Sequence, residues 1–321
     1  MLFNKFIFIP LLFVILTVLV LLSLSIGSEY IPLSNLWGKE QSKHLEDILL
    51  LIRLPRIFNA LTIGALLSLA GLMIQNLVKN PLADPYILGV SGASASIQLI
   101  IIASGAVLPL WLFILIGFIA SLLSLLLLIK ISSKNGLNTN NLLLSGVVIA
   151  FAYGAIISLV LTLSPMSSTK SMLFWLMGDL SFSQFSVIPI LFLIIGVLWT
   201  YKYHKEMDLL ARGEFFAKKC GVDVDKINLI LLLSSSIFTA IAVSMAGTIG
   251  FVGLVVPHIA RLLVGNTHAK LIPLSALIGA IVLLIADTFS RTIVAPIQLP
   301  VGIFTAIFGV PVFLILLHKK S

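Results

Sequence analysis

The ionisable side chains that stand beside long apolar runs are the first candidates for chemistry in this sequence. Arg53 and Arg56 open one apolar run, and Arg291 lies near the end of another, four residues after Asp287. A planar guanidinium holds a carboxylate through two parallel hydrogen bonds, and this is the chemistry that these arginines offer. Two alternatives stay open, namely anchoring at lipid headgroups and, for Arg291, an ion pair with Asp287 one helical turn away.

The remaining reactive side chains are too isolated to suggest catalysis. Cys220 is the only cysteine, which excludes an intramolecular disulfide and a thiol metal site. His258 follows a proline and stands one turn before Arg261, and we interpret it as structural rather than as a ligand or proton relay. The sequence has no G-x-x-x-x-G-K-[ST] pattern, so any ATP hydrolysis belongs to another chain. We predict no catalytic residues, no metal and no cofactor.

The elements that position these residues are membrane helices. The 321 residues are 60% hydrophobic and only 10% charged, whereas about 25% is usual in soluble domains. Apolar runs of about twenty residues recur between short polar breaks, which indicates helices and not the alternating strands of a β-barrel. The net charge of +8 does not indicate nucleic-acid binding, because the basic residues sit in those short breaks. The sequence therefore predicts an all-α polytopic membrane protein embedded in a lipid bilayer.

We expect about ten membrane helices in one domain that spans residues 1–321. The first is interpreted as a helix and not as a signal peptide, because its apolar core is too long and no A-x-A site follows. The ten predicted ranges are 6–27, 57–78, 89–104, 109–131, 142–163, 185–202, 228–246, 249–264, 271–294 and 301–318.

The distribution of lysine and arginine predicts the orientation of these helices. With the N-terminus inside, fourteen of the twenty basic residues fall on the inner side of the membrane. Inner loops of membrane proteins carry this excess of basic residues. We therefore expect both termini in the cytoplasm.

Two stretches resemble a known family. The first is RLPR followed by NPLADPYILGVSGAS, within residues 53–94, and the second contains GFVGLVVPHIARLLVG, LLIADTFSR and QLPVG, within residues 247–302. Both closely resemble the FecCD family, the permease subunits of ABC importers for iron–siderophore complexes, haem and cobalamin. The resemblance runs from about Arg53 to Leu317.

The resemblance implies a fold, a set of partners and a location in the cell. The fold is a type II ABC importer permease-like bundle in the cell membrane (inner or plasma membrane), which itself does no covalent chemistry. The implied partners are a second permease subunit, identical or similar, two copies of an ATP-binding subunit, and an extracytoplasmic substrate-binding protein.

The resemblance also implies roles for particular residues. The arginines Arg53, Arg56 and Arg291 match positions that receive glutamates of the binding protein. The segment 205–227 matches the part that contacts the ATPase, with a short helix closed by a glycine; the matching residues are Gly213, Glu214, Ala217 and Gly221. A solvated loop is the alternative for this segment.

The polar break at 132–141 matches a cytoplasmic gate, with Thr139 and Asn140 nearest the axis, and a plain polar turn is the alternative. A stand-alone secondary transporter or channel is the alternative for the whole chain. Such transporters usually carry buried carboxylates near the membrane midplane, and here Asp287 is almost the only ionisable residue away from helix ends.

Overall fold

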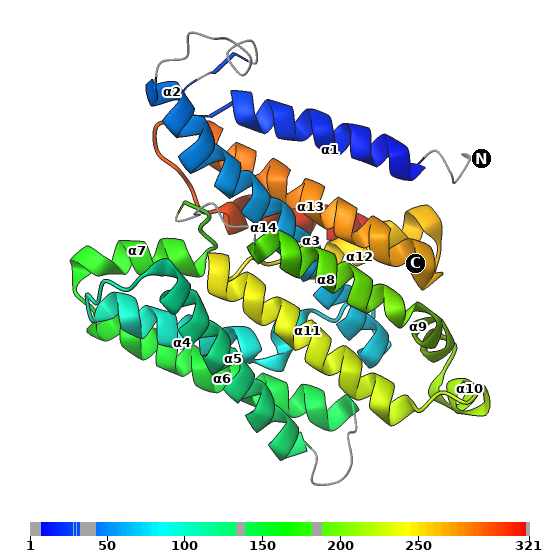
Figure 1. Ribbon diagram of the computed structural model, residues 1–321. Coiled ribbons are helices and arrows are strands. Elements are labelled where there is room, and N and C mark those ends of the chain that lie inside the picture. Colours follow the sequence, from blue (N-terminus) through cyan, green and yellow to red (C-terminus); the bar gives the residue numbers. More distant parts are fainter. Residues whose placement is uncertain are drawn as a thin grey trace.

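A computed structural model of the chain describes residues 8–27, 29, 31–32, 43–132, 139–181 and 188–318. The described residues form a bundle of helices and contain no strand (Figure 1). Five helices are long and apolar enough to cross a membrane, and five shorter apolar helices accompany them. The predicted all-α membrane fold is confirmed.

Each of the ten predicted ranges contains one apolar helix, and most boundaries agree within three residues. These helices are α1 (Phe8–Ser25), α3 (Leu54–Val78), α4 (Val90–Ala103), α5 (Leu110–Ser132), α6 (Thr139–Leu163), α8 (Ile188–Lys202), α11 (Val224–Ala246), α12 (Val252–Val264), α13 (His268–Thr292) and α14 (Val301–His318).

Short helices connect these elements at the two ends of the bundle. They are α2 (Lys43–Asp47), the π-helix η2 (Ile48–Arg53), the 3-10 helix η3 (Pro85–Leu88), α7 (Met166–Leu176), α9 (His204–Ala211) and α10 (Glu214–Lys219). We call the two ends the α7 end and the α10 end (Figure 1). Helix α3 begins at the α7 end, and α13 runs back toward it.

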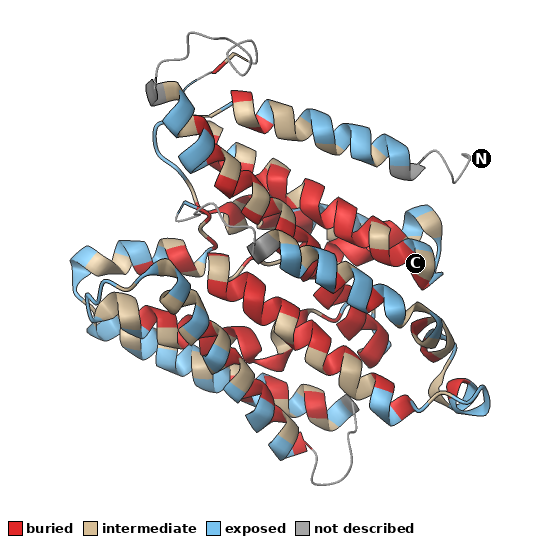
Figure 2. Cartoon of the chain, in the orientation of Figure 1, coloured by how far each residue is buried: buried red, intermediate tan, exposed pale blue. Residues whose placement is uncertain are grey.

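Helix α3 lies at the centre of the bundle. In its most apolar stretch 89% of the residues are buried, whereas the corresponding figure for α6 is 11%. Figure 2 shows the buried residues concentrated in α3, α11 and α13, with α1 and α6 largely exposed. A helix that is apolar on all sides is buried by its neighbours or faces lipid, so α3 forms the core and α6 presents an open face.

Small residues let the backbones of α3 and α13 touch. A Cβ added at Gly64 would overlap the carbonyl oxygen of Gly279, and one added at Gly279 would lie 2.7 Å from Cβ of Ser68. The Ser68 hydroxyl donates a hydrogen bond of 2.8 Å to the carbonyl oxygen of Ser275. Close approach of this kind is how helices associate in membranes, where burial of apolar surface gives no driving force.

A short non-helical segment inside the bundle connects α11 to α12. Phe251, which precedes α12, adopts a left-handed conformation with φ of 69°. The hydroxyl of Tyr86 in η3 donates to the carbonyl oxygen of Ile249 at 3.0 Å and accepts from its amide at 3.0 Å. The predicted helix 249–264 therefore begins three residues later than expected, and η3 satisfies backbone groups that this segment frees.

A methyl group at Gly279 tests the close packing of α3 and α13. We expect Gly279→Ala to destabilise the folded chain by about 1–3 kcal/mol, because the added carbon meets the backbone of α3. The matched control is Gly154→Ala in α6, where an added Cβ meets no atom within 4 Å. The measurement is thermal unfolding of both purified variants in detergent. Equal unfolding temperatures would contradict the packing argument.

Candidate functional site

The structure brings Arg53, Arg56 and Arg291 together at the α7 end, from η2, α3 and α13. They are 4%, 3% and 4% exposed, respectively. A charged group at the edge of a membrane bundle is costly to bury unless it is paired, so the partners of these arginines decide what the cluster can do. We call these three residues with Asp287 the arginine cluster.

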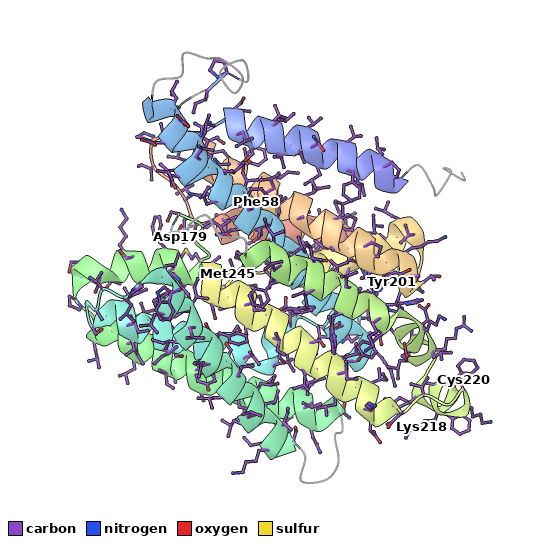
Figure 3. The ribbon with its side chains drawn as sticks, in the orientation of Figure 1. Phe58, Asp179, Tyr201, Lys218, Cys220 and Met245 are labelled. Carbon is purple, nitrogen blue, oxygen red and sulfur yellow. The ribbon has the colours of Figure 1, made fainter. Side chains whose placement is uncertain are left out.

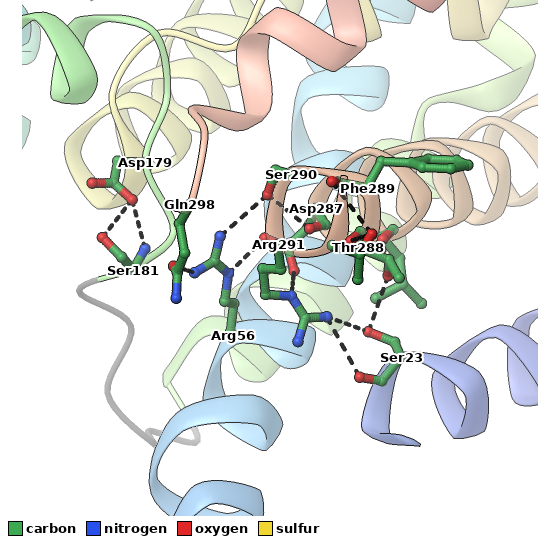
Figure 4. A network of polar contacts seen from close by, with 12 residues as sticks. Ser23, Arg56, Asp179, Ser181, Asp287, Thr288, Phe289, Ser290, Arg291 and Gln298 are labelled. Atoms are coloured by element: carbon green, nitrogen blue, oxygen red, sulfur yellow. Dashed lines mark hydrogen bonds and ion pairs between the residues drawn. The ribbon is translucent and has the colours of Figure 1, made fainter. Parts of the chain in front are cut away.

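The carboxylate of Asp287 joins two of the arginines (Figure 4). Its Oδ1 lies 2.6 Å from Nε of Arg56, and its Oδ2 lies 3.0 Å from Nε of Arg291. Arg56 also donates to Gln298 Oε1 at 2.6 Å, and Arg291 donates to Ser23 Oγ at 2.6 Å. The ion pair within α13, left open from the sequence, is therefore present, and it extends to α3 and to α1.

Arg53 has a different set of partners, all of them backbone oxygens. Its guanidinium donates to the carbonyl oxygens of Leu24, Ser25 and Glu29, with a distance of 2.9 Å to Ser25. Leu24 and Ser25 form the last turn of α1, where unpaired carbonyls give the helix its negative end. Arg53 therefore caps α1 and holds it against η2 and α3.

These contacts bear on the predicted docking role. The guanidinium groups already hold internal acceptors and are buried, so a carboxylate of a partner has to displace one of those acceptors to form a direct bond. The cluster fastens α1, α3 and α13 at one end of the bundle. Docking of a binding protein at these three arginines stays a prediction.

At the α10 end, α9 and α10 form the segment predicted at 205–227. Gly213 has φ of 117° and opens α10, and Gly221 has φ of 83° after its end. The amide of Val222 donates to the carbonyl of Ala217 at 3.0 Å, and that of Gly221 donates to the carbonyl of Lys218 at 3.0 Å. This is the Schellman pattern, so the predicted short helix closed by a glycine is confirmed.

Helix α10 projects from the bundle and carries exposed side chains. Figure 3 labels Lys218 and Cys220 at its tip. Phe215 is 73% exposed, whereas Ala217 is fully buried against the neighbouring helices. The position of α10 suits a contact with another protein, although its role in coupling stays a prediction.

Glu214 has a partner that sequence reasoning missed. Its Oε1 lies 2.7 Å from Nζ of Lys79, the residue that ends α3 in a left-handed conformation with φ of 55°. Both side chains are 42% exposed, so water screens the pair. The two residues are 135 positions apart, and no local pattern in the sequence points to their contact.

The two residues predicted for a gate lie in the first turn of α6. Asn140 is exposed, while the side chain of Thr139 and the preceding residues 133–138 fall outside the described residues. The gate therefore stays a prediction. In the described part of the chain, no group of three or more His, Cys, Asp or Glu side chains is placed to hold a metal ion.

Loss of the carboxylate at Asp287 tests the arginine cluster. Asp287→Ala leaves two buried guanidinium groups without their anion, and breaking a buried pair costs about 3–5 kcal/mol. We expect a large loss of folded protein in the membrane and a lower unfolding temperature. Lys79→Ala, which breaks the exposed pair with Glu214, is the control and should cost about 0–1 kcal/mol. If both variants unfold at the same temperature, the cluster does not hold the helices together.

Comparison with known proteins identifies a matching family and similar proteins. The model of the FecCD transport family matches residues 15–319. The hemin transport system permease protein HmuU of Yersinia pestis is 36% identical over 319 residues, covering 96% of this chain and 94% of that protein. The cobalamin import system permease protein BtuC of Halobacterium salinarum is 40% identical over 280 residues, covering 84% of this chain and 73% of that protein.

A solved structure of a metal-chelate type ABC transporter in an inward-facing conformation has the same fold. It superposes with a TM-score of 0.85 at 29% identity, covering 96% of this chain and 97% of that one. The match of the family model extends over the three helices that carry the arginine cluster, η2, α3 and α13, and over α9 and α10. The chain therefore belongs to the FecCD transport family.

Proposed function

We propose that this chain is the membrane-spanning permease subunit of an ABC importer that takes up a metal chelate. An iron–siderophore complex is our first choice of cargo, and haem or cobalamin comes next. The observation that carries the proposal is the likeness, over 96% of the chain, to a metal-chelate type ABC transporter. The named relatives for hemin and cobalamin handle large metal complexes of organic ligands, which supports the class of cargo.

ATP hydrolysis belongs to separate subunits, since chains of this family are non-catalytic transport permeases. In our proposal, one ATP-binding subunit docks on α10 of each of two permease chains. The exposed ring of Phe215 and the basic side chains of Lys218 and Lys219 offer an apolar and positively charged contact surface. A short helix held by caps at both ends can pass a movement of the partner to the bundle.

In our proposal, the second permease chain packs against the open face of the bundle, and the path for the cargo lies there. Only 11% of the most apolar stretch of α6 is buried in this chain. We place the path at an interface between two permease chains that includes α6. Thr139 and Asn140, at the start of α6, are then the candidate gate on the cytoplasmic side. Our proposal also puts both termini in the cytoplasm, as the distribution of basic residues predicts.

The extracytoplasmic binding protein then docks at the α7 end, beside the arginine cluster. Arg53 is the arginine of choice for this role, because its hydrogen bonds within the described part of the chain go to neutral carbonyl oxygens, while the carboxylate of Glu29 acts on it through its charge alone. Arg56 and Arg291 share the carboxylate of Asp287, so they offer less charge to a partner.

A secondary transporter that works alone is less well supported. Proton-coupled and sodium-coupled transporters use a buried carboxylate that can change its charge or its ligand. Within the described helices, Asp287 is fully buried and lies between the guanidinium groups of Arg56 and Arg291. That arrangement fits a structural ion pair better than a carboxylate that carries protons or sodium ions.

Reversal of charge at Glu214 tests the coupling role. The chain is first purified from its native membrane, and we expect an ATPase subunit to come with it. In the reconstituted complex, Glu214→Lys should lower ATP-driven uptake by about fivefold or more, while ATP hydrolysis continues. Glu214→Asp is the control, because it keeps the negative charge at the start of α10. Normal uptake by Glu214→Lys would remove the coupling assignment.

Neutralisation of Arg53 tests the docking role without reversing a buried charge. Glutamine at position 53 keeps N–H donors for the carbonyl oxygens of α1 but lacks the positive charge. We expect Arg53→Gln to weaken the affinity of the binding protein about tenfold at low salt, and less at high salt. Lys170→Gln removes an exposed charge from α7 at the same end and serves as the control. An unchanged affinity in Arg53→Gln would leave Arg53 with the cap of α1 alone.

A further inference from the structure

We infer that α3 and α13 move as one unit with α9, through a contact of Asp208, Asn76 and His268 at the α10 end. This inference rests on the proposed function, since α9 adjoins the helix that we assign to the ATPase contact. It names the side chains that connect that contact to the membrane helices. We call these three residues the α9 link.

The first part of the link is a cap supplied by another helix. Oδ1 of Asp208 accepts a hydrogen bond of 2.8 Å from the backbone amide of His268 and lies 2.7 Å from its Nδ1. His268 is the first residue of α13, and its N-cap residue Thr267 makes no side-chain cap. A carboxylate at a helix N-terminus satisfies free amides and meets the positive end of the helix dipole. Asp208 of α9 therefore caps α13.

The second part of the α9 link joins α3 to α9 and to α13. Nδ2 of Asn76 donates to the carbonyl oxygen of Met207 in α9 at 3.0 Å and lies 3.0 Å from Nε2 of His268. An amide nitrogen can only donate, so Nε2 of His268 accepts and its proton sits on Nδ1, directed at Asp208. Each side chain thus fixes the orientation of the next. Asn76 is 7% exposed and His268 is 3% exposed, so water competes little for the bond between them, whereas the side chain of Asp208 is 28% exposed.

Further contacts hold α3 and α13 in one antiparallel register over their length. From the α7 end they are Arg56 with Asp287, Gly64 with Gly279, Ser68 with Ser275, and Asn76 with His268. The positions rise along α3 in nearly the same steps by which they fall along α13. From Arg56 to Asn76 is a distance of about 30 Å along the helix axis.

Three kinds of contact make relative sliding of the two helices costly. An ion pair joins the two helices at the α7 end, and their backbones touch near the middle. The α9 link joins them at the α10 end. Packed helices of this kind shift between discrete arrangements and do not deform continuously. A displacement of α9 is then delivered to the arginine cluster at the far end. The exposed pair of Lys79 with Glu214 also joins α3 to α10, but water screens it.

The test measures distances in the assembled transporter by electron spin resonance. The chain carries Cys220→Ser, and spin labels are placed in α9 at Lys205→Cys and just beyond α13 at Ile293→Cys, two exposed positions. A second label pair joins Lys205→Cys to Leu123→Cys on the exposed face of α5. The complex, with its ATPase subunits and an unlabelled second permease chain, is measured in lipid nanodiscs with and without Mg-ATP.

The two label pairs are expected to respond differently to Mg-ATP. The distance between positions 205 and 293 stays constant when Mg-ATP is added, whereas the distance between positions 205 and 123 shifts. In Asp208→Ala, the 205–293 distance becomes dependent on Mg-ATP, because α9 now moves without α13. In the matched control Lys79→Ala, it stays constant. A purely structural role would broaden the distances equally with and without the nucleotide.

Other outcomes overturn the inference. A shift of the 205–293 distance on addition of Mg-ATP in the otherwise unaltered chain shows that α9 and α13 move separately, and this arm needs no folded Asp208→Ala variant. Constant distances in Asp208→Ala would show that the α9 link does not join the helices. If no ATPase subunit assembles with the chain, or if Mg-ATP shifts neither label pair, the proposed function itself fails.

Discussion

The bundle depends on one buried carboxylate, that of Asp287, held between the guanidinium groups of Arg56 and Arg291. An ion in a membrane protein loses its hydration, and only a partner of opposite charge with good geometry offsets that loss. Because the two arginines come from α3 and α13, the pairing fixes where these helices meet. Hydrogen bonds from the same network reach Ser23 in α1 and Gln298 before α14, so a single charge orders four segments of the chain.

Away from this charge, the helices hold together through shape. In lipid, a leucine gains little by leaving one apolar neighbour for another, so specificity comes from close backbone contact and from polar groups that find partners. Gly64 and Gly279 give the contact between α3 and α13, and Gly71 with Gly253 gives a similar one between α3 and α12. Serine hydroxyls, as at Ser68, add hydrogen bonds to backbone oxygens at the same level. The small residues of the sequence therefore mark the helices that meet.

Local patterns in the sequence were enough to predict the helices, but not their partners. Apolar runs bounded by charge or by proline and glycine placed all ten membrane helices, and Gly221 correctly marked the end of α10. The helix α9 was not predicted, since HKEMDLLA has no long apolar run. The pairing of Arg291 with Asp287 was foreseen as one option because the residues are a turn apart. That of Arg56 with Asp287 was not, because 231 residues separate them and only the packing of α3 on α13 brings them together.

The charge balance of the arginine cluster reconciles a structural role with a role in docking. Among the described residues, Arg56 and Arg291 share the carboxylate of Asp287, and Arg53 donates to backbone carbonyl oxygens. Side-chain oxygens such as Ser23 Oγ meet part of the remaining positive charge. Those dipoles stabilise the charge locally but do not cancel it at longer range. In our proposal, this charge attracts an acidic surface of the binding protein to the α7 end without breaking any internal bond. The same arginines can fasten α1, α3 and α13 and still direct the approach of a partner, which is why their burial alone does not decide against docking.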